Sequence, residues 1–96
     1  MLIDHQRREV YLRGKQVELT DLLYNLLLYL VQSDGRTISE EELDHAVWGP
    51  DEVAGSKERV KAGIKALRQA LGEYKPYIIN IRGKGYAFIP YLPNKA

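Results

Sequence analysis

Two cations lie next to two glycines near the C-terminus, in the segment NIRGKGYAFI of residues 80–89. Glycine adopts positive φ angles without steric cost, so the chain can reverse sharply around Arg82 and Lys84. Alternating apolar residues flank the glycines, with Ile79 and Ile81 on one side and aromatic residues on the other, and they predict two strands. The segment therefore predicts a β-hairpin with two positive charges at its tip. Such a tip suits either contact with a polyanion or a solvated turn.

Basic residues are concentrated in the second half of the chain, although the formal net charge is only +1. Residues 1–55 carry five Lys or Arg against eleven Asp or Glu, whereas residues 56–85 carry eight against two. The first segment therefore has a charge of −6 and the second a charge of +6. This asymmetry indicates a side of the molecule that faces a polyanion. A helix with a solvated basic face explains the same charges, and composition does not decide between the two interpretations.

Most of these cations lie on a helix that is expected to begin after the cap Ser56 and to end at Gly72. Its predicted buried stripe, at helical spacing, consists of Val60, Ile64, Leu67 and Leu71. Its opposite face and flank consist of Lys57, Arg59, Lys61, Ala62, Lys65, Ala66, Arg68 and Gln69. A basic helix of this kind fits the major groove of duplex DNA, where cations along its rims neutralise phosphates.

Strands and two further helices must position this basic helix. Alternating apolar residues predict a β-hairpin over about residues 8–19, and short strands are also expected at residues 2–3 and 37–38. The first helix is capped by Thr20 and is apolar on nearly all sides, so it should form the buried centre before it ends at Gly35. A second helix is capped by Ser39 and ends at the Gly-Pro pair of residues 49–50.

The order of these segments resembles the winged-helix effector domains of OmpR/PhoB-type response regulators. The resemblance is carried by LRGKQVELT before the first helix, ISEEELDHAVWG in the second, RVKAGIKALRQAL in the third and INIRGKGYAFI in the hairpin. It implies an α+β fold, a winged helix-turn-helix, in one domain over residues 1–96. The expected parts are short N-terminal antiparallel strands (1–19), three helices (20–72) and a C-terminal β-hairpin wing (76–90).

The resemblance also implies a function, which is binding of double-stranded DNA by the effector domain of a bacterial transcription regulator in a two-component system. The third helix would enter the major groove, and Arg82 at the tip of the wing would enter the adjacent minor groove. The residues that match DNA-binding positions, or lie beside them, are Trp48, Lys57, Arg59, Lys61, Ala62, Lys65, Ala66, Arg68, Gln69, Asn80, Arg82, Lys84 and Tyr86.

Two further partners are implied by the resemblance. The loop between the second and third helices corresponds to a segment that contacts RNA polymerase in activators of this type. It consists of Gly49, Pro50, Asp51, Glu52, Val53, Ala54 and Gly55. A receiver or sensor domain is expected elsewhere in a longer chain.

Some residues depart from the family pattern and keep a second interpretation open. Ala62, Gly63 and Ala66 replace larger side chains, which leaves few groups for bidentate base readout. Specificity is then expected to be weak or shape-based, or the domain is instead a protein-interaction module of a larger signalling protein without DNA binding. Trp48 is equally well explained by packing against the core, and Gly63 by close approach of either another element or a DNA backbone.

Catalysis, metal binding and a cofactor are not expected. The chain has no cysteine and no phosphate-binding loop, and His5 and His45 lack neighbours at metal-ligand spacing. No apolar run approaches the about 18 residues that a membrane span needs, and MLIDHQRREV at the N-terminus has no signal pattern. A cytoplasmic location is therefore expected.

Overall fold

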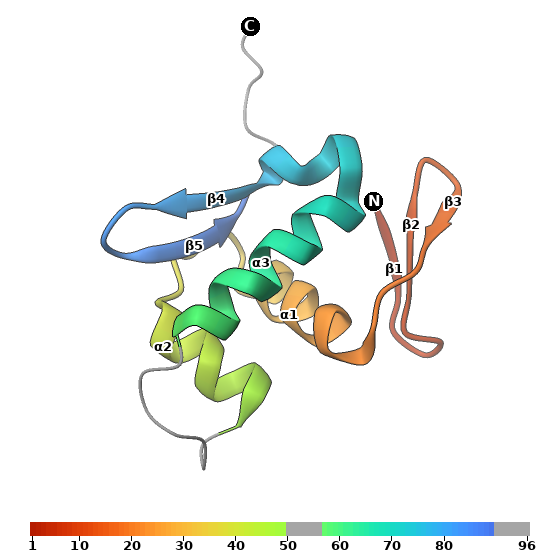
Figure 1. The fold of residues 1–96 in the computed structure, drawn as a ribbon. Helices are drawn as coiled ribbons and strands as arrows, with labels where there is room; N and C mark the ends of the chain where they lie inside the picture. The colour runs from red at the N-terminus through yellow and green to blue at the C-terminus, as the bar shows by residue number, and fades with distance from the viewer. Residues whose placement is uncertain (50–56, 90–96) are drawn as a thin grey trace, which may run out of the picture.

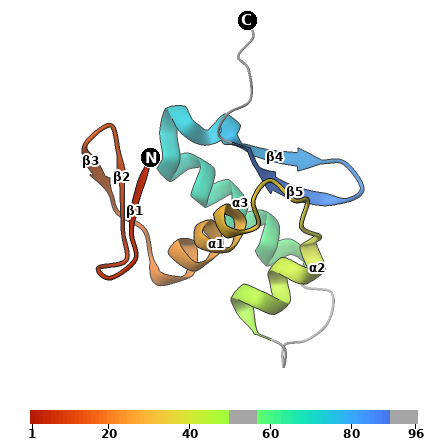
Figure 2. The same ribbon diagram turned by 180° about the vertical axis from the view of Figure 1, so that it is seen from behind.

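The computed structural model of the chain describes residues 1–49 and 57–89. Two small antiparallel sheets lie on opposite sides of the helices, with α1 and α3 crossing between them (Figures 1 and 2). The elements in chain order are β1 (Leu2–Asp4), β2 (Glu9–Leu12), β3 (Lys15–Val17), α1 (Asp21–Gln32), α2 (Glu40–Leu43), η1 (Asp44–Trp48), α3 (Lys57–Leu71), η2 (Gly72–Tyr77), β4 (Ile78–Ile81) and β5 (Gly85–Phe88). The predicted winged-helix order is confirmed.

The N-terminal sheet has the strand order β1-β2-β3, so both the predicted hairpin and the additional edge strand are present. Ile3 pairs with Val10, and Val10 pairs with Val17 on the other side. The chain turns between β2 and β3 at Arg13 and Gly14, which both have positive φ angles (52° and 80°). Val10 is almost fully buried, which anchors the sheet to the helices.

The helix α1 forms the centre of the core, as its apolar composition predicts. The Thr20 side chain accepts a hydrogen bond from the backbone N–H of Leu23 at 3.2 Å and caps the helix. Beyond its C-terminal end, Asp34 and Gly35 both have left-handed backbone angles (φ 56° and 82°) that redirect the chain. The buried residues of α1 are Tyr24, Leu26, Leu27 and Leu30.

The second helix is not the single α-helix that the sequence predicts. It begins as expected, with the Ser39 hydroxyl accepting from the N–H of Glu42 at 3.0 Å, but it changes from α to π geometry at Asp44. The wider turn ends where the N–H of Gly49 donates to the carbonyl of Asp44 at 3.2 Å. In this geometry the side chains of Asp44 and Trp48, at the two ends of η1, both contact α3.

The helix α3 buries the predicted stripe. Val60 and Leu67 are fully buried, and Ile64 and Leu71 are at most 3% exposed. Gly72 ends the α-helix with a φ angle of 60°, and the chain continues directly into the 3-10 helix η2, which was not predicted from the sequence. The predicted cap Ser56 lies outside the described residues.

The wing consists of β4 and β5, in which Asn80 pairs with Tyr86. Ile38 forms an isolated antiparallel β-bridge with β5, because its N–H donates to the carbonyl of Tyr86 at 2.7 Å and its carbonyl accepts from the N–H of Tyr86 at 2.8 Å. The strand expected at residues 37–38 is thus reduced to a one-residue bridge at Ile38. Gly85 belongs to β5 rather than to the tip, and a Cβ there would lie 2.0 Å from the carbonyl oxygen of Ile38. The tip is therefore formed by Arg82, Gly83 and Lys84.

Candidate nucleic-acid interface

One face of α3 is exposed along its middle two turns. The 3.6-residue period places the apolar positions in the core and brings the intervening side chains to the surface together. The exposed residues on this face that the sequence predicts as DNA-binding are Lys61, Ala62, Lys65, Ala66 and Gln69. Gly63, which lies between them in sequence, is buried. Of the residues predicted for the outer face and flank of this helix, these five are exposed, and two of them are lysines.

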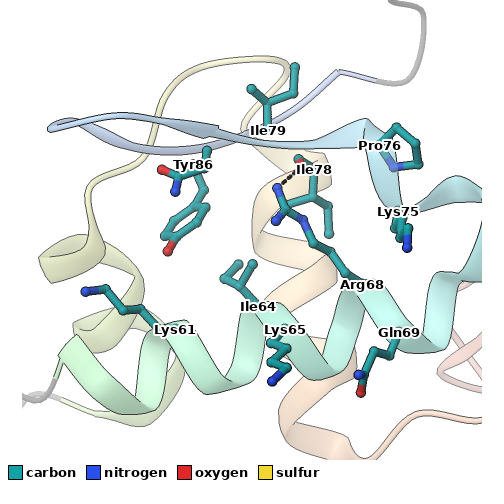
Figure 3. A pocket seen from close by; sticks show the side chains of 11 residues that line it. Lys61, Ile64, Lys65, Arg68, Gln69, Lys75, Pro76, Ile78, Ile79 and Tyr86 are labelled. Carbon is teal, nitrogen blue, oxygen red and sulfur yellow. Dashed lines mark hydrogen bonds between the residues drawn. The ribbon is translucent and has the colours of Figure 1, made fainter.

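A groove separates this face from the wing (Figure 3). Helix α3 contributes Lys61, Lys65 and Gln69 to its wall, and Figure 3 shows these side chains extending from the helix. Lys75 in η2 and Asn80 in β4 line it on the wing side and are both exposed. Three lysines from two elements therefore surround one open groove, and they make it attractive to an anion.

Arg68 does not extend outward with the other cations. Its guanidinium Nη2 donates to the backbone carbonyl of Ile78, at the start of β4, and Figure 3 shows the side chain reaching from α3 to the wing. The Nε atom of Arg68 is buried and has no hydrogen-bond partner within the described part of the chain. Arg68 therefore holds the wing against α3, and its predicted phosphate contact remains a prediction.

Tyr86 in β5 lines the groove from the wing and is only 4% exposed (Figure 3). Its hydroxyl donates to Oε2 of Glu40, 3.2 Å away and 46 residues earlier in the chain. Burial raises the pKa of Tyr86, and the negative charge of Glu40 raises it further. The tyrosine is therefore a neutral, fixed part of the wall, so it lies beside the predicted interface rather than on its outer surface.

The tip of the wing presents its two cations to solvent. Arg82 and Lys84 are both exposed, and neither forms an ion pair with a carboxylate of residues 1–49 or 57–89. A second groove between the tip and the start of α2 is lined by these cations, by Lys61 and by two carboxylates, Glu40 and Glu41. The sequence predicts no interface role for the two glutamates, because nothing in their spacing indicates that Ile38 brings β5 beside them.

Trp48 packs against the core and α3. A Cβ built on Gly63 would lie 3.0 Å from Cη2 of Trp48 and 3.3 Å from Cδ2 of Leu26. The glycine within α3 is therefore explained by close approach of the tryptophan ring, which decides between the two explanations left open by the sequence. Contact of Trp48 with a DNA backbone remains a prediction.

Arg59 is directed towards η1 and away from the groove. Its Nε donates to Oδ1 of Asp44 at 2.5 Å, and the two side chains are only 22% and 19% exposed. The guanidinium carbon also lies 5.6 Å from the centre of the Trp48 ring, at a distance typical of cation–π contact. Sequence reasoning missed Asp44 because it lies 15 residues from Arg59, on a helix whose geometry was expected to be different.

The remaining predicted residues are described only in part. Lys57 is the first residue of α3, and Gly49 follows η1 directly. The rest of the predicted polymerase-contact loop, Pro50, Asp51, Glu52, Val53, Ala54 and Gly55, lies outside the described residues. Within residues 1–49 and 57–89, no helix has the length and apolar character to cross a membrane, and no three His, Asp or Glu side chains form a metal-binding group.

Comparisons with known proteins agree with this geometry. The family model described as "Transcriptional regulatory protein, C terminal" matches residues 14–88. The transcriptional regulatory protein YclJ of Bacillus subtilis is 41% identical over 88 residues, which cover 90% of this chain and 38% of that protein. The alkaline phosphatase synthesis transcriptional regulatory protein PhoP of Bacillus subtilis is 40% identical over 89 residues, which cover 90% of this chain and 36% of that protein.

A solved structure gives the same comparison in three dimensions. The DNA-binding domain of Klebsiella pneumoniae RstA, in complex with the RstA box, superposes with a TM-score of 0.83. It is 28% identical in sequence, and the match covers 93% of this chain and 90% of that one. The chain therefore has the fold of that domain over nearly its whole length, but it spans only about two fifths of the curated relatives YclJ and PhoP.

Proposed function

The chain belongs to the family of C-terminal domains of transcriptional regulatory proteins, and from this premise we propose that it is the DNA-binding effector domain of a bacterial response regulator. The observation that carries the proposal is the exposed face of α3, which lies across one groove from a wing with two exposed cations at its tip. Helix α3 enters the major groove of double-stranded DNA, and the wing reaches the adjacent minor groove.

The described cations contact different parts of the duplex. Lys61 and Lys65 neutralise phosphates along the rim of the major groove nearest the wing. Arg82 extends from a turn in which Gly83, with a φ angle of 77°, keeps the backbone thin. A thin positive tip fits a narrow A·T-rich minor groove, where the negative potential is concentrated.

Sequence readout is expected to be weak in the major groove. Ala62 and Ala66 have no polar side-chain atoms, so they can contact thymine methyl groups but form no hydrogen bonds with base edges. Gln69 is the one exposed amide among the predicted residues of α3. Affinity therefore comes mainly from phosphates and the wing, and specificity comes mainly from the shape and deformability of the DNA.

The larger context of the domain is also a proposal. Because the relatives are much longer than this chain, we propose that the full protein carries a receiver or sensor domain that controls DNA binding. The loop at residues 49–55 contacts RNA polymerase when the regulator acts as an activator. A protein with this role acts in the cytoplasm, where bacterial chromosomal DNA lies.

The proposal is tested by fluorescence-anisotropy titration of a pool of random duplexes of about 25 base pairs, at low and near-physiological salt, with sequencing of the bound fraction afterwards. Salt-sensitive binding with enrichment of a sequence or of A·T-rich shape is the expected result. Salt-sensitive binding without enrichment would mean that specificity comes from elsewhere in the longer protein. Absence of binding at low salt would contradict the proposal.

A second candidate, a protein-docking module, is favoured by one observation: the smooth surface that Ala62 and Ala66 present on α3. The substitution Ala62→Glu separates the two functions. A DNA-binding domain should lose affinity for duplex, because a carboxylate would face phosphates. A docking module should bind no duplex either before or after the substitution, and it should lose its protein partner instead.

A further inference from the structure

We propose that Asp44 is a positioning residue that withholds Arg59 from DNA, so that the described side chains of α3 present positive charge mainly on the side of the wing. This inference rests on the proposed DNA-binding function and concerns the charge that α3 presents to phosphates. The family resemblance predicts a phosphate contact for Arg59, whereas the structure directs its guanidinium to η1. Neither the sequence pattern nor the resemblance assigns a role to Asp44.

Asp44 and Trp48 both hold Arg59 in this position. Its Nε donates to Oδ1 of Asp44 at 2.5 Å, and its guanidinium carbon lies 5.6 Å from the centre of the Trp48 ring. The tryptophan is itself fixed, because Gly63 allows its ring to approach the backbone of α3. All four residues lie on the two helical segments that flank residues 50–56, so the contacts join η1 directly to α3.

The burial of the pair makes the arrangement persistent. With side-chain exposures of 22% and 19%, the two charges are screened by solvent less than an exposed pair would be. If Arg59 turned towards a phosphate, it would leave the carboxylate of Asp44 partly buried without its cation, and it would also lose its contact with Trp48. A phosphate must therefore compete with an internal anion that is already in place.

Helical geometry gives the consequence for DNA. Arg59, Ala62 and Ala66 follow one another at i, i+3 and i+7, so they lie along one edge of α3. Lys61 and Lys65 lie on the other edge and line the groove beside the wing. Because Asp44 neutralises Arg59, the edge nearer η1 is electrically neutral. The helix thus contacts phosphates mainly on the side of the wing. The DNA strand on that side of the major groove therefore receives more of the phosphate contacts than the other strand.

The test is the isosteric substitution Asp44→Asn, with the slope of log Kd against log salt measured on random-sequence duplex. The variant retains an oxygen that can accept from Arg59 but removes the competing charge. We expect tighter binding at low salt and a slope steeper by about 0.9, the value for one additional phosphate contact. If Asp44 had only a structural role, the variant would instead bind more weakly with an unchanged or shallower slope.

Asp34→Asn is the matched control. Asp34 is exposed beyond the end of α1, and asparagine tolerates its positive φ angle of 56°. This variant has the same net charge as Asp44→Asn but does not alter the partner of Arg59. A slope that steepens equally in both variants would show a general charge effect and would overturn the inference.

The double variant Asp44→Asn/Arg59→Gln decides the question even if the single variant does not fold. It replaces the ion pair by two neutral amides and leaves the net charge unchanged. The inference predicts the parental slope, because Arg59 contributes no phosphate contact in the parent. A slope shallower by about 0.9 would show that Arg59 contacts a phosphate directly and would overturn the inference. A parent domain that bound no duplex at low salt would instead overturn the proposed function itself.

Discussion

At the scale of single residues, the cations of α3 and the wing fall into two groups. Lys61, Lys65 and Arg82 are exposed, whereas Arg59 and Arg68 direct their donors to Asp44 and to the carbonyl of Ile78. Charge alone does not distinguish the groups, because all five lie in the basic half of the sequence. The two groups differ in whether the N–H donors of the side chain already form hydrogen bonds with an acceptor elsewhere in the fold.

Arg82 belongs to the exposed group, so its removal should weaken DNA binding without changing the fold. We expect Arg82→Ala to reduce affinity for random duplex and to make the slope of log Kd against log salt shallower by about 0.9. Fluorescence anisotropy at several salt concentrations measures both. Lys15→Ala, an exposed cation on the N-terminal sheet, is the control and should leave the slope unchanged. If Arg82→Ala bound duplex as tightly as the parent, the tip of the wing would not be part of the DNA interface.

The exposed group could be predicted from the sequence, because helical period places Lys61 and Lys65 opposite the buried stripe. The engaged group could not be predicted in the same way. The partners of Arg59 and Arg68 lie too far away in the sequence for helical or strand periodicity to indicate them. Asp44 is 15 residues from Arg59, and Ile78 is 10 residues from Arg68. The exposed face could therefore be predicted from the sequence. Which of its cations are free of internal hydrogen bonds and can contact DNA depends on the tertiary structure.

At the scale of elements, the wing is held in place by the segment that precedes α2. Gly85 has a φ angle of 146°, and a Cβ there would lie 2.0 Å from the carbonyl oxygen of Ile38. Gly83 at the tip has a φ angle of 77°, but no atom lies within 4 Å of the position of its Cβ. The two glycines therefore serve different purposes, although both belong to the same short motif.

These two positions should respond differently to an alanine substitution. Gly83→Ala should lower the free energy of unfolding by about 1–2 kcal/mol, the cost of a left-handed backbone angle for a residue with a side chain. Gly85→Ala should lower it by about 3 kcal/mol or more, because backbone atoms must also move apart. Urea denaturation measures both values. If the two variants were equally stable, the contact between Ile38 and β5 would not restrain the wing.

The helices α1 and α2 are joined by a cluster around Glu42. Its carboxylate accepts from the Tyr29 hydroxyl at 2.5 Å and from Nη2 of Arg36 at 2.8 Å. The hydrogen bond from Arg36, together with the weaker effect of that from Tyr29, lowers the pKa of Glu42 from its ordinary value of 4.5 to about 2. The same contact raises the pKa of Tyr29. The cluster connects α1, the turn after it and the first turn of α2.

A lowered pKa in the folded state means that ionised Glu42 stabilises the fold. The contribution is fully present above the ordinary pKa of 4.5 and is lost as the pH falls towards about 2. Glu42→Gln should therefore lower the melting temperature at neutral pH, and the difference from the parent should shrink between pH 4.5 and pH 2. Glu41→Gln, at an exposed neighbouring position, should show no such change. A difference that stays constant with pH would contradict the role of the carboxylate charge.

Secondary structure was predicted well where capping residues and period agree, as at Thr20 and Ser39. It was predicted poorly where tertiary contacts decide the geometry. The change to a π-helix at Asp44 accompanies contacts with Arg59 and Gly63, which the local sequence does not report. The 3-10 helix after Gly72 was likewise missed, because a glycine that ends an α-helix does not specify the conformation of the next residues.

At the scale of the whole molecule, the charge separation in the sequence becomes a spatial one. The exposed lysines of α3 and η2 surround one groove, and the wing tip beside it adds two further cations. Glu40 and Glu41 are the acidic residues that line the neighbouring groove. A molecule with a net charge of only +1 can therefore present a strongly positive side to DNA, and the carboxylates limit how far that side extends.

The number of exposed cations on this side bounds the salt dependence of DNA binding. Among the side chains that the structure describes, they are Lys61, Lys65, Lys75, Arg82 and Lys84. At about 0.9 per neutralised phosphate, three to five such contacts give an expected slope of log affinity against log salt between about −2.7 and −4.5. Replacing Lys61 and Lys65 together by glutamine should make this slope shallower by about 1.8, and replacing Arg7 and Lys15 on the opposite sheet should leave it unchanged. A parental slope near zero would mean that the positive side does not contact phosphates, and it would favour the docking module over the DNA-binding domain.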